Sequence, residues 1–236
     1  VPSRQMRVFA ALQFLVPVRD VHVVYNAVLP EDCRSSLSAE QARARLDLPA
    51  GAKVVTIVGS LRPVKNHAML LRVARLSLDW PTPPVFLIVG DGPLRADLQQ
   101  EVHRLGLEGR VRFLGDRNDV ADILGATDVN VSTSVSEGLP NTLIEASMAG
   151  VVCVATRNGG SSDVVMNHRT GFLVPVDDDA VMASRIRQVL EDETLRARMS
   201  DEARAFAESR FSPAALADRL TGLWRHYLDQ KQDGPQ

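Results

Sequence analysis

The sequence predicts an α/β fold in which six parallel strands form a doubly wound sheet, followed by C-terminal helices. From residue 53 onward, six short apolar runs each precede a segment with helical periodicity. These runs contain few polar residues, and such strands are typical of a parallel sheet that helices cover on both faces. From residue 192 onward only helical patterns remain, so two further helices should close the chain.

The predicted elements follow one another in a regular order. Branched aliphatic residues and phenylalanine dominate the strands, while apolar residues three or four positions apart mark the helices. A Ser-Pro pair separates the last two helices, as a cap and a first-turn residue would. The strand–helix pairs are 53–60 with 67–78, 85–92 with 93–107, 111–115 with 118–126, 129–134 with 141–149, 151–156 with 161–165 and 170–176 with 180–192, and the closing helices are 192–211 and 212–230.

The stretch 136–150, SEGLPNTLIEASMAG, places two glutamates around the start of one predicted helix. Pro140 suits the first helical position, and Gly150 suits the residue that follows the end. The free N–H groups of the first turn can hold a phosphate. Glu137 lies just before the helix and Glu145 just over a turn inside it, where carboxylates can accept hydrogen bonds from sugar hydroxyls.

The chain divides into three predicted parts. Residues 1–30 open in mid-pattern, without a methionine, and include a strand-like segment at 21–28. We interpret them as the remnant of an N-terminal domain and an interdomain linker. Residues 31–211 form the sheet domain, and residues 212–236 form a C-terminal helix with an apolar stripe and a short tail.

Composition and charge restrict the classes of function. The chain has 45% hydrophobic residues, 24% charged residues and a formal net charge of −2, which is ordinary for a soluble protein and disfavours nucleic acid as a partner. The two cysteines and five histidines show no disulfide or metal-ligand spacing, and only His67 lies near a candidate site. No run is long and apolar enough to span a membrane, so we expect a cytoplasmic protein, with contact at the inner face of the membrane left open.

Candidate site residues follow the strands, because ligands of an open parallel sheet bind beyond the carboxyl ends of its strands. Glycine recurs in these loops and lets the backbone approach a ligand, although tight turns need glycine in any case. Arg62 and Lys65 can neutralise a diphosphate leaving group, unless they are simply solvated. The Walker, G-x-G-x-x-G and G-x-S-x-G patterns are missing, which disfavours nucleotide hydrolases, nicotinamide dehydrogenases and serine hydrolases. A glycosidase is disfavoured because Glu137 and Glu145 come from one turn and its helix.

Six motifs, in this order, resemble those of a known family. They are GSLRPVKN at 59–66, IVGDGPL at 88–94, VRFLG at 111–115, SEGLPNTLIEASMAG at 136–150, NGGSSDVV at 158–165 and TGFLVP at 170–175. Over about residues 24–230 the chain resembles the C-terminal, donor-binding domain of family-4 retaining glycosyltransferases, the Rossmann-like half of a GT-B fold. The E-x7-E spacing of Glu137 and Glu145 is the most specific part of the resemblance.

The resemblance implies a role for each matching residue. Glu137 would lie beside the hydroxyls of the donor sugar, and Glu145 would accept hydrogen bonds from the ribose. Arg62 and Lys65 would stabilise the diphosphate without a metal ion or another cofactor, although Arg62 stands two residues after the usual position, which Ser60 occupies. The residues implied in catalysis are Arg62, Lys65 and Glu137, and those implied in nucleotide binding are Gly59, Ser60, Gly90, Asp91, Gly92, Pro93, Leu94, Arg112, Phe113, Leu114, Gly138, Leu139, Pro140, Asn141, Thr142 and Glu145.

These roles imply a glycosyltransferase half that binds a nucleotide-diphosphate sugar, with uridine favoured over guanosine, and transfers the sugar with retention. The acceptor would bind to an N-terminal domain or to a partner chain, which leaves open whether the isolated chain is active. An alternative is a non-catalytic nucleotide-sugar-binding subunit that docks on such a partner through exposed apolar residues, while an epimerase or phosphorylase of the same fold is disfavoured. The docking residues would be Phe9, Leu12, Phe14, Leu15, Trp224 and Leu228.

Overall fold

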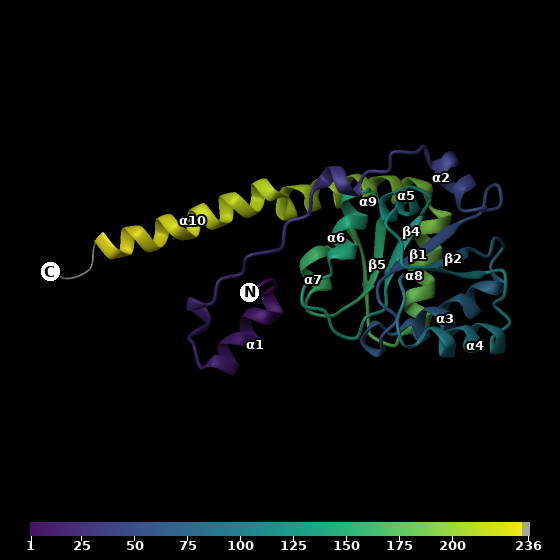
Figure 1. Cartoon of the computed structure of the whole chain (residues 1–236), viewed down its shortest axis with the longest axis horizontal. Helices are drawn as coiled ribbons and strands as arrows, with labels where there is room; N and C mark the ends of the chain where they lie inside the picture. Colours follow the sequence, from purple (N-terminus) through teal and green to yellow (C-terminus); the bar gives the residue numbers. More distant parts are fainter. Residues whose placement is uncertain (233–236) are drawn as a thin grey trace.

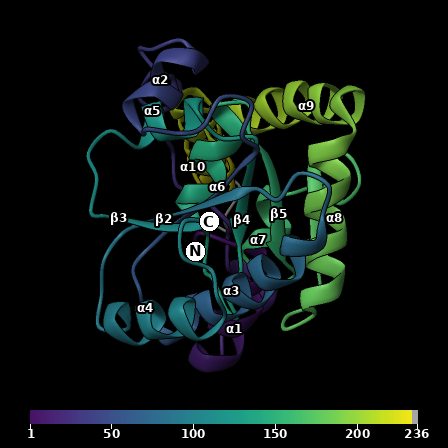
Figure 2. The ribbon, with the colours of Figure 1, turned by 90° about the vertical axis from the view of Figure 1, so that its right-hand side faces the viewer.

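The structure is a computed structural model that describes residues 1–232 (Figure 1), so the end of the predicted tail lies outside the described residues. Six parallel strands form one sheet in the order β3-β2-β1-β4-β5-β6, and helices cover both of its faces (Figure 2). The prediction of a doubly wound parallel sheet is confirmed. The strands are β1 (Val54–Val58), β2 (Val85–Val89), β3 (Val111–Gly115), β4 (Val129–Ser132), β5 (Val152–Thr156) and β6 (Gly171–Val174).

The helices lie close to their predicted positions, apart from two N-terminal ones that were not predicted, α1 and α2. In α2 the side chains of Ser38 and Gln41 each accept a hydrogen bond from the other's backbone N–H, which forms a capping box. The S-x-x-Q pattern at 38–41 was the signal for this helix. The helices are α1 (Arg4–Phe14), α2 (Ala39–Arg45), α3 (His67–Leu76), α4 (Arg95–Arg104), α5 (Val120–Gly125), α6 (Asn141–Met148), α7 (Ser161–Val164), α8 (Asp179–Glu191), α9 (Glu193–Phe211) and α10 (Pro213–Gln232).

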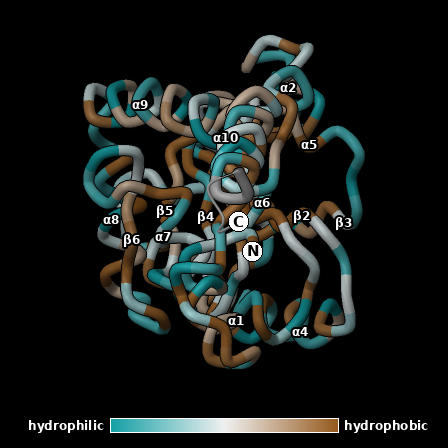
Figure 3. The backbone as a smooth tube through the Cα atoms, turned by 90° about the vertical axis from the view of Figure 1, so that its left-hand side faces the viewer, coloured by the Kyte–Doolittle hydropathy of each residue, from teal (hydrophilic) through white to brown (hydrophobic). Residues whose placement is uncertain are grey.

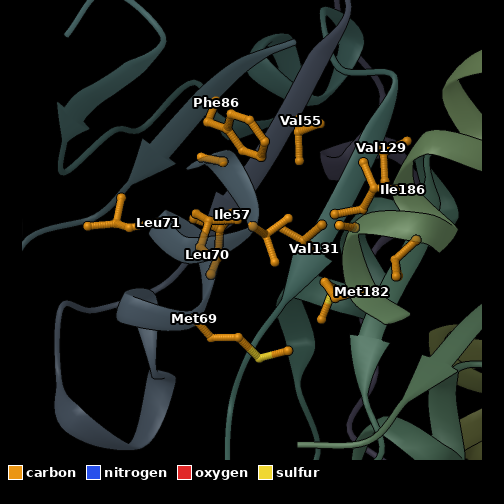
Figure 4. Close-up of a cluster of buried hydrophobic side chains, with 14 of the residues drawn as sticks. Val55, Ile57, Met69, Leu70, Leu71, Phe86, Val129, Val131, Met182 and Ile186 are labelled. Carbon is orange, nitrogen blue, oxygen red and sulfur yellow. The ribbon is translucent and has the colours of Figure 1, made fainter. Parts of the chain in front are cut away.

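Apolar side chains fill the space between the sheet and the helices on each face. Figure 4 shows one such layer, in which Ile57 of β1 and Val131 of β4 lie near Leu70 of α3 and Met182 of α8. On the opposite face Cys153 of β5 belongs to a buried cluster that includes residues of α6 and α9. Burial on both faces explains why the strands are apolar along their whole length.

The strand order reverses between β1 and β4. β2 and β3 lie on one side of β1, whereas β4, β5 and β6 lie on the other. Val55 pairs with Val129 and Thr56 with Asn130, so the loops that follow β1 and β4 leave the sheet side by side. A crevice for a ligand is expected at such a reversal of strand order.

The segment 21–28 forms no strand in the described structure, so that prediction is wrong. It runs as extended chain, and the N–H of Val28 donates to the carbonyl of Phe211 at 2.8 Å. The ring of Tyr25 lies edge-on to the ring of Phe211, with 5.2 Å between their centroids. Packing on the end of α9 therefore replaces the sheet partner that the apolar pattern suggested.

α1 and α10 lie at the same end of the molecule, away from the sheet (Figure 1). Figure 3 faces this end and shows hydrophobic stretches in α1. Within residues 1–232, no helix combines the length and the apolar character needed to cross a membrane. The apolar side chains expected to be exposed are exposed in the structure, namely Phe9, Leu12, Phe14, Leu15, Trp224 and Leu228.

Candidate functional site

The loops after β1 and β4 bring Lys65 and Glu137 into direct contact. The ammonium of Lys65 donates to Oε1 of Glu137 at 2.6 Å. The hydroxyl of Ser134 donates to the same oxygen, also at 2.6 Å. Because the side chain of Glu137 is only 13% exposed, these two donors hold its carboxylate in one orientation.

Hydrogen bonds from three loops fix this arrangement. The hydroxyl of Thr133 donates to the carbonyl of Lys65 at 2.7 Å. From the loop after β5, the N–H of Gly160 donates to the carbonyl of Glu137 at 3.1 Å. A Cβ atom at position 160 would lie 2.6 Å from the carbonyl oxygen of Gly138, so glycine is required there by the close approach of the two loops.

α6 begins at Asn141, as the predicted range 141–149 has it, so Pro140 lies just before the first helical position to which it was assigned. Pro140 precedes the helix with ψ 97°, and Asn141 is its first residue. Gly150 follows the helix in the left-handed region with φ 78°, as predicted. In the described part of the chain, the N–H groups of Asn141 and Thr142 have no hydrogen-bond acceptor. The start of α6 therefore offers free donors to a ligand.

A cavity of about 490 Å³ opens beside Glu145. No group among residues 1–232 hydrogen-bonds to the half-buried carboxylate of Glu145, and burial raises its pKa. The walls come from segment 27–33, from Asn118 and Val120 around the start of α5, and from Asn141. An acceptor without a donor, at the wall of such a cavity, suits a ligand that carries hydroxyl groups. We refer to this space as the Glu145 cavity.

A second cavity, of about 10 Å³, adjoins the Lys65–Glu137 pair. His67, the first residue of α3, lines this cavity and is 1% exposed. Neither of its ring nitrogens has a hydrogen-bond partner in the described structure. Burial, and then the charge of Lys65, lower the pKa of His67 to about 4, so the ring is neutral at neutral pH. We refer to this space as the His67 cavity.

The predicted loop residues after β2 lie against the loop after β1. The N–H of Leu61 donates to the carbonyl of Asp91 at 2.9 Å, and the N–H of Leu94 donates to the carbonyl of Leu61 at 3.1 Å. The carboxylate of Asp91 forms an ion pair with Arg95. Residues 90–94 thus support the first loop through their backbone. In that loop Arg62 is exposed, and within the described chain its guanidinium has no partner.

The side chains of the predicted segment 112–114 do not line either cavity. The guanidinium of Arg112 donates to the carbonyls of Leu46 and Asp47, at 2.9 and 3.1 Å. Phe113 and Leu114 pack against the buried clusters of the core. Asn118 and Val120, which were not predicted, reach the Glu145 cavity instead. Their position shortly after β3 could have identified them as candidate site residues, because ligands of a parallel sheet bind at the loops beyond the carboxyl ends of its strands.

Residues 38–206 match the family model described as glycosyl transferases group 1. The chain belongs to this family. Among the relatives of this chain, N-acetyl-alpha-D-glucosaminyl L-malate synthase of Bacillus anthracis is 28% identical, over 94% of the chain and 58% of the relative. The lipopolysaccharide core biosynthesis glycosyltransferase LpsE of Rhizobium meliloti is 35% identical, over 77% of the chain and 52% of the relative. The chain thus spans little more than half the length of these relatives.

Solved structures with high TM-scores show the same fold. Anabaena HepE, crystallised in complex with UDP and glucose, superposes with a TM-score of 0.86 at 26% identity, over 95% of this chain and 62% of that one. WaaG, a glycosyltransferase involved in lipopolysaccharide biosynthesis, has a TM-score of 0.81 at 18% identity, over 92% and 60% of the two chains. The expected resemblance to the C-terminal half of GT-B glycosyltransferases is confirmed.

The buried imidazole of His67 should make the stability of this group 1 domain depend on pH. The pKa of His67 lies near 4 in the folded chain, whereas its ordinary value is 6.5. As the pH falls, His67 is therefore protonated in the unfolded chain before it is protonated in the folded chain, which favours unfolding. Between pH 7.5 and pH 5 this group should lower the free energy of unfolding by about 2 kcal/mol. Urea denaturation at both pH values, for the wild type and His67→Gln, measures the effect.

The difference between the wild type and His67→Gln isolates the effect of His67, because all other titrating groups, including Glu145, are common to both proteins. The loss between pH 7.5 and pH 5 should be smaller in His67→Gln than in the wild type. An equal loss in both would show that His67 is not held neutral by the fold.

Proposed function

We propose that this chain is the donor-binding half of a glycosyltransferase that takes its sugar from a nucleotide diphosphate. The proposal is carried by the position of the first turn of α6, which lies between the carboxylates of Glu137 and Glu145. Thr142 lines the His67 cavity together with Lys65 and Glu137, and Asn141 lines the Glu145 cavity. A molecule with a polar group at each end and phosphates in the middle suits this arrangement.

The nucleoside fits the Glu145 cavity. Its volume of about 490 Å³ is within the usual range for small-molecule sites. The ribose hydroxyls would donate to the carboxylate of Glu145, which has no donor among the described residues. The base would lie near Asn118 and Val120. We favour uridine because HepE, a similar structure, was crystallised with UDP.

The diphosphate fits the start of α6. The N–H groups of Asn141 and Thr142 are free to donate, and the helix dipole favours negative charge at this position. Lys65 and the exposed Arg62 add positive charge from the loop after β1. When the bond between the sugar and the diphosphate breaks, the electron pair remains on the phosphate oxygen, where these groups stabilise it. The two cations supply this charge from side chains, so we propose that transfer needs no metal ion.

Glu137 is the group we assign to the donor sugar. Its Oε1 is occupied by Lys65 and Ser134, whereas Oε2 has no donor among residues 1–232. Oε2 is therefore available to accept a hydrogen bond from a sugar hydroxyl. The acceptor oxygen would form the new bond to the anomeric carbon as the bond to the diphosphate breaks, and its proton would pass to the departing phosphate oxygen. Retention of configuration is proposed from the resemblance to retaining enzymes. The acceptor itself would bind to another domain or chain.

Calorimetric titration of the chain with UDP, in EDTA and then with magnesium, tests this function. We expect binding in EDTA, and we expect Glu145→Ala to weaken it by about 1–3 kcal/mol, the range for hydrogen bonds to a charged group. Lys65→Ala should weaken binding as well, because the diphosphate loses a cation. Glu40→Ala on the exposed face of α2 is the matched control. UDP binding that survives both site variants unchanged would contradict the assignment.

The exposed apolar residues favour a second candidate, a non-catalytic subunit that docks on a partner chain. Phe14 is 68% exposed, Leu15 is 91% exposed and Trp224 is 68% exposed, all on α1, its C-cap or α10. Such a large apolar surface is typical of an interface. Both candidates use the same donor site, and they differ in whether the chain takes part in sugar transfer.

We expect the isolated chain to self-associate through this surface, and we expect the double variant Leu15→Lys/Trp224→Lys to sediment as a monomer with an unchanged affinity for UDP. Neither residue lines the Glu145 cavity or the His67 cavity. Analytical ultracentrifugation over a range of concentrations measures the association. A wild-type chain that remains monomeric would count against docking through these helices, and transfer of sugar by the isolated chain would exclude the non-catalytic candidate.

A further inference from the structure

We propose that His67 holds a single water molecule in the His67 cavity and that this water fixes the position of the Lys65–Glu137 pair. His67 is then a positioning residue of the donor site. The inference deepens the proposed function and rests on it for the role of the pair. The presence of the water itself can be tested without a nucleotide.

The first observation is the unsatisfied imidazole. His67 is 1% exposed, and within the described chain neither Nδ1 nor Nε2 has a hydrogen-bond partner. A neutral imidazole has one donor and one acceptor nitrogen, and burying both without partners is costly. A polar group in this situation is usually satisfied by an ordered water.

The second observation is the size and chemistry of the cavity. Its volume of about 10 Å³ is at the lower limit for one water and far too small for a sugar or a phosphate. A buried water needs two to four polar partners. Besides His67 and the ion pair, the hydroxyl-bearing residues Ser132, Ser134 and Thr142 line the same space. The walls are therefore polar enough to bind the water.

The third observation is the uneven use of the Glu137 carboxylate. Lys65 and Ser134 both donate to Oε1 at 2.6 Å, which leaves Oε2 without a donor in the described structure. A water between His67 and the pair can donate to Glu137 or accept from Lys65. It would link the rigid start of α3 to both catalytic side chains.

The neutral state of the ring suits this role. Lys65 and Glu137 are the charged groups that line the cavity within the described residues. A protonated His67 would repel Lys65 and compete with it for the carboxylate of Glu137. Burial and the charge of Lys65 lower the pKa of His67 to about 4, so at neutral pH the ring offers hydrogen bonds without charge.

A ligand-free crystal structure at about 1.5 Å resolution tests the water directly. We expect one water within hydrogen-bond distance of a His67 ring nitrogen and of Glu137, Lys65 or one of the lining hydroxyl groups. A dry cavity, or a ring that bonds directly to a protein group, would overturn the proposal. This result does not depend on nucleotide binding.

Two variants test the positioning role. His67→Phe keeps the planar shape and removes both nitrogens, whereas His67→Gln keeps hydrogen-bonding capacity. We expect His67→Phe to bind UDP about tenfold more weakly, and His67→Gln to remain within about threefold of the wild type. Wild-type affinity in His67→Phe, or an equal loss in both variants, would overturn the positioning role.

The two proposals fail in different ways. A folded wild-type chain that binds no UDP would contradict the proposed function, while the crystal structure would still decide whether the water is present. If His67→Phe does not fold, as judged by circular dichroism, crystals of His67→Leu replace it, because leucine also removes both ring nitrogens. A displaced Lys65–Glu137 pair in crystals that lack the water supports the proposal, and an unmoved pair overturns it.

Discussion

The pairing of β1 with β4 is the constraint on which the candidate site depends. These strands are far apart in the sequence, but they are neighbours in the sheet, at the point where the strand order reverses. Their pairing sets the two following loops side by side, which allows Lys65 to reach Glu137. Gly160 then closes the arrangement from β5, because only a residue without a side chain permits its approach to Gly138. The geometry of the site thus follows from the sheet rather than from any single loop.

The two glutamates of the site differ in their charge partners. Lys65 and Glu137 form a largely buried ion pair, and removal of either partner would leave an uncompensated charge. Glu145, in contrast, has no partner among the described residues, and burial raises its pKa. A carboxylate kept unpaired beside a cavity costs stability, which a bound ribose would offset through its hydroxyl groups. This contrast between a paired and an unpaired glutamate is the main reason to read the site as a donor-binding site.

The parallel sheet could be predicted from the sequence because it depends on local patterns, whereas the roles of Lys65, Glu137 and Glu145 stay predictions. Apolar runs that alternate with helical periodicity are enough for a doubly wound sheet, and the loops after the strands contain Lys65, Glu137 and Glu145. The details that the sequence did not predict depend on packing between distant segments. Segment 21–28 has the apolar pattern of a strand, but it packs against Phe211 at the end of α9. The guanidinium of Arg112 donates to two backbone carbonyls. Asn118 lines the Glu145 cavity together with Asn141 and Glu145, which come from a distant part of the sequence.

A crystal structure of the chain with UDP would test the proposed donor site directly. We predict that the ribose hydroxyls lie within hydrogen-bond distance of the Glu145 carboxylate, and that the diphosphate contacts Lys65 and the N–H groups at the start of α6. The Lys65–Glu137 loops should move little, because they are already fixed by the sheet. UDP bound elsewhere on the molecule, or bound with its ribose away from Glu145, would contradict the proposed donor site.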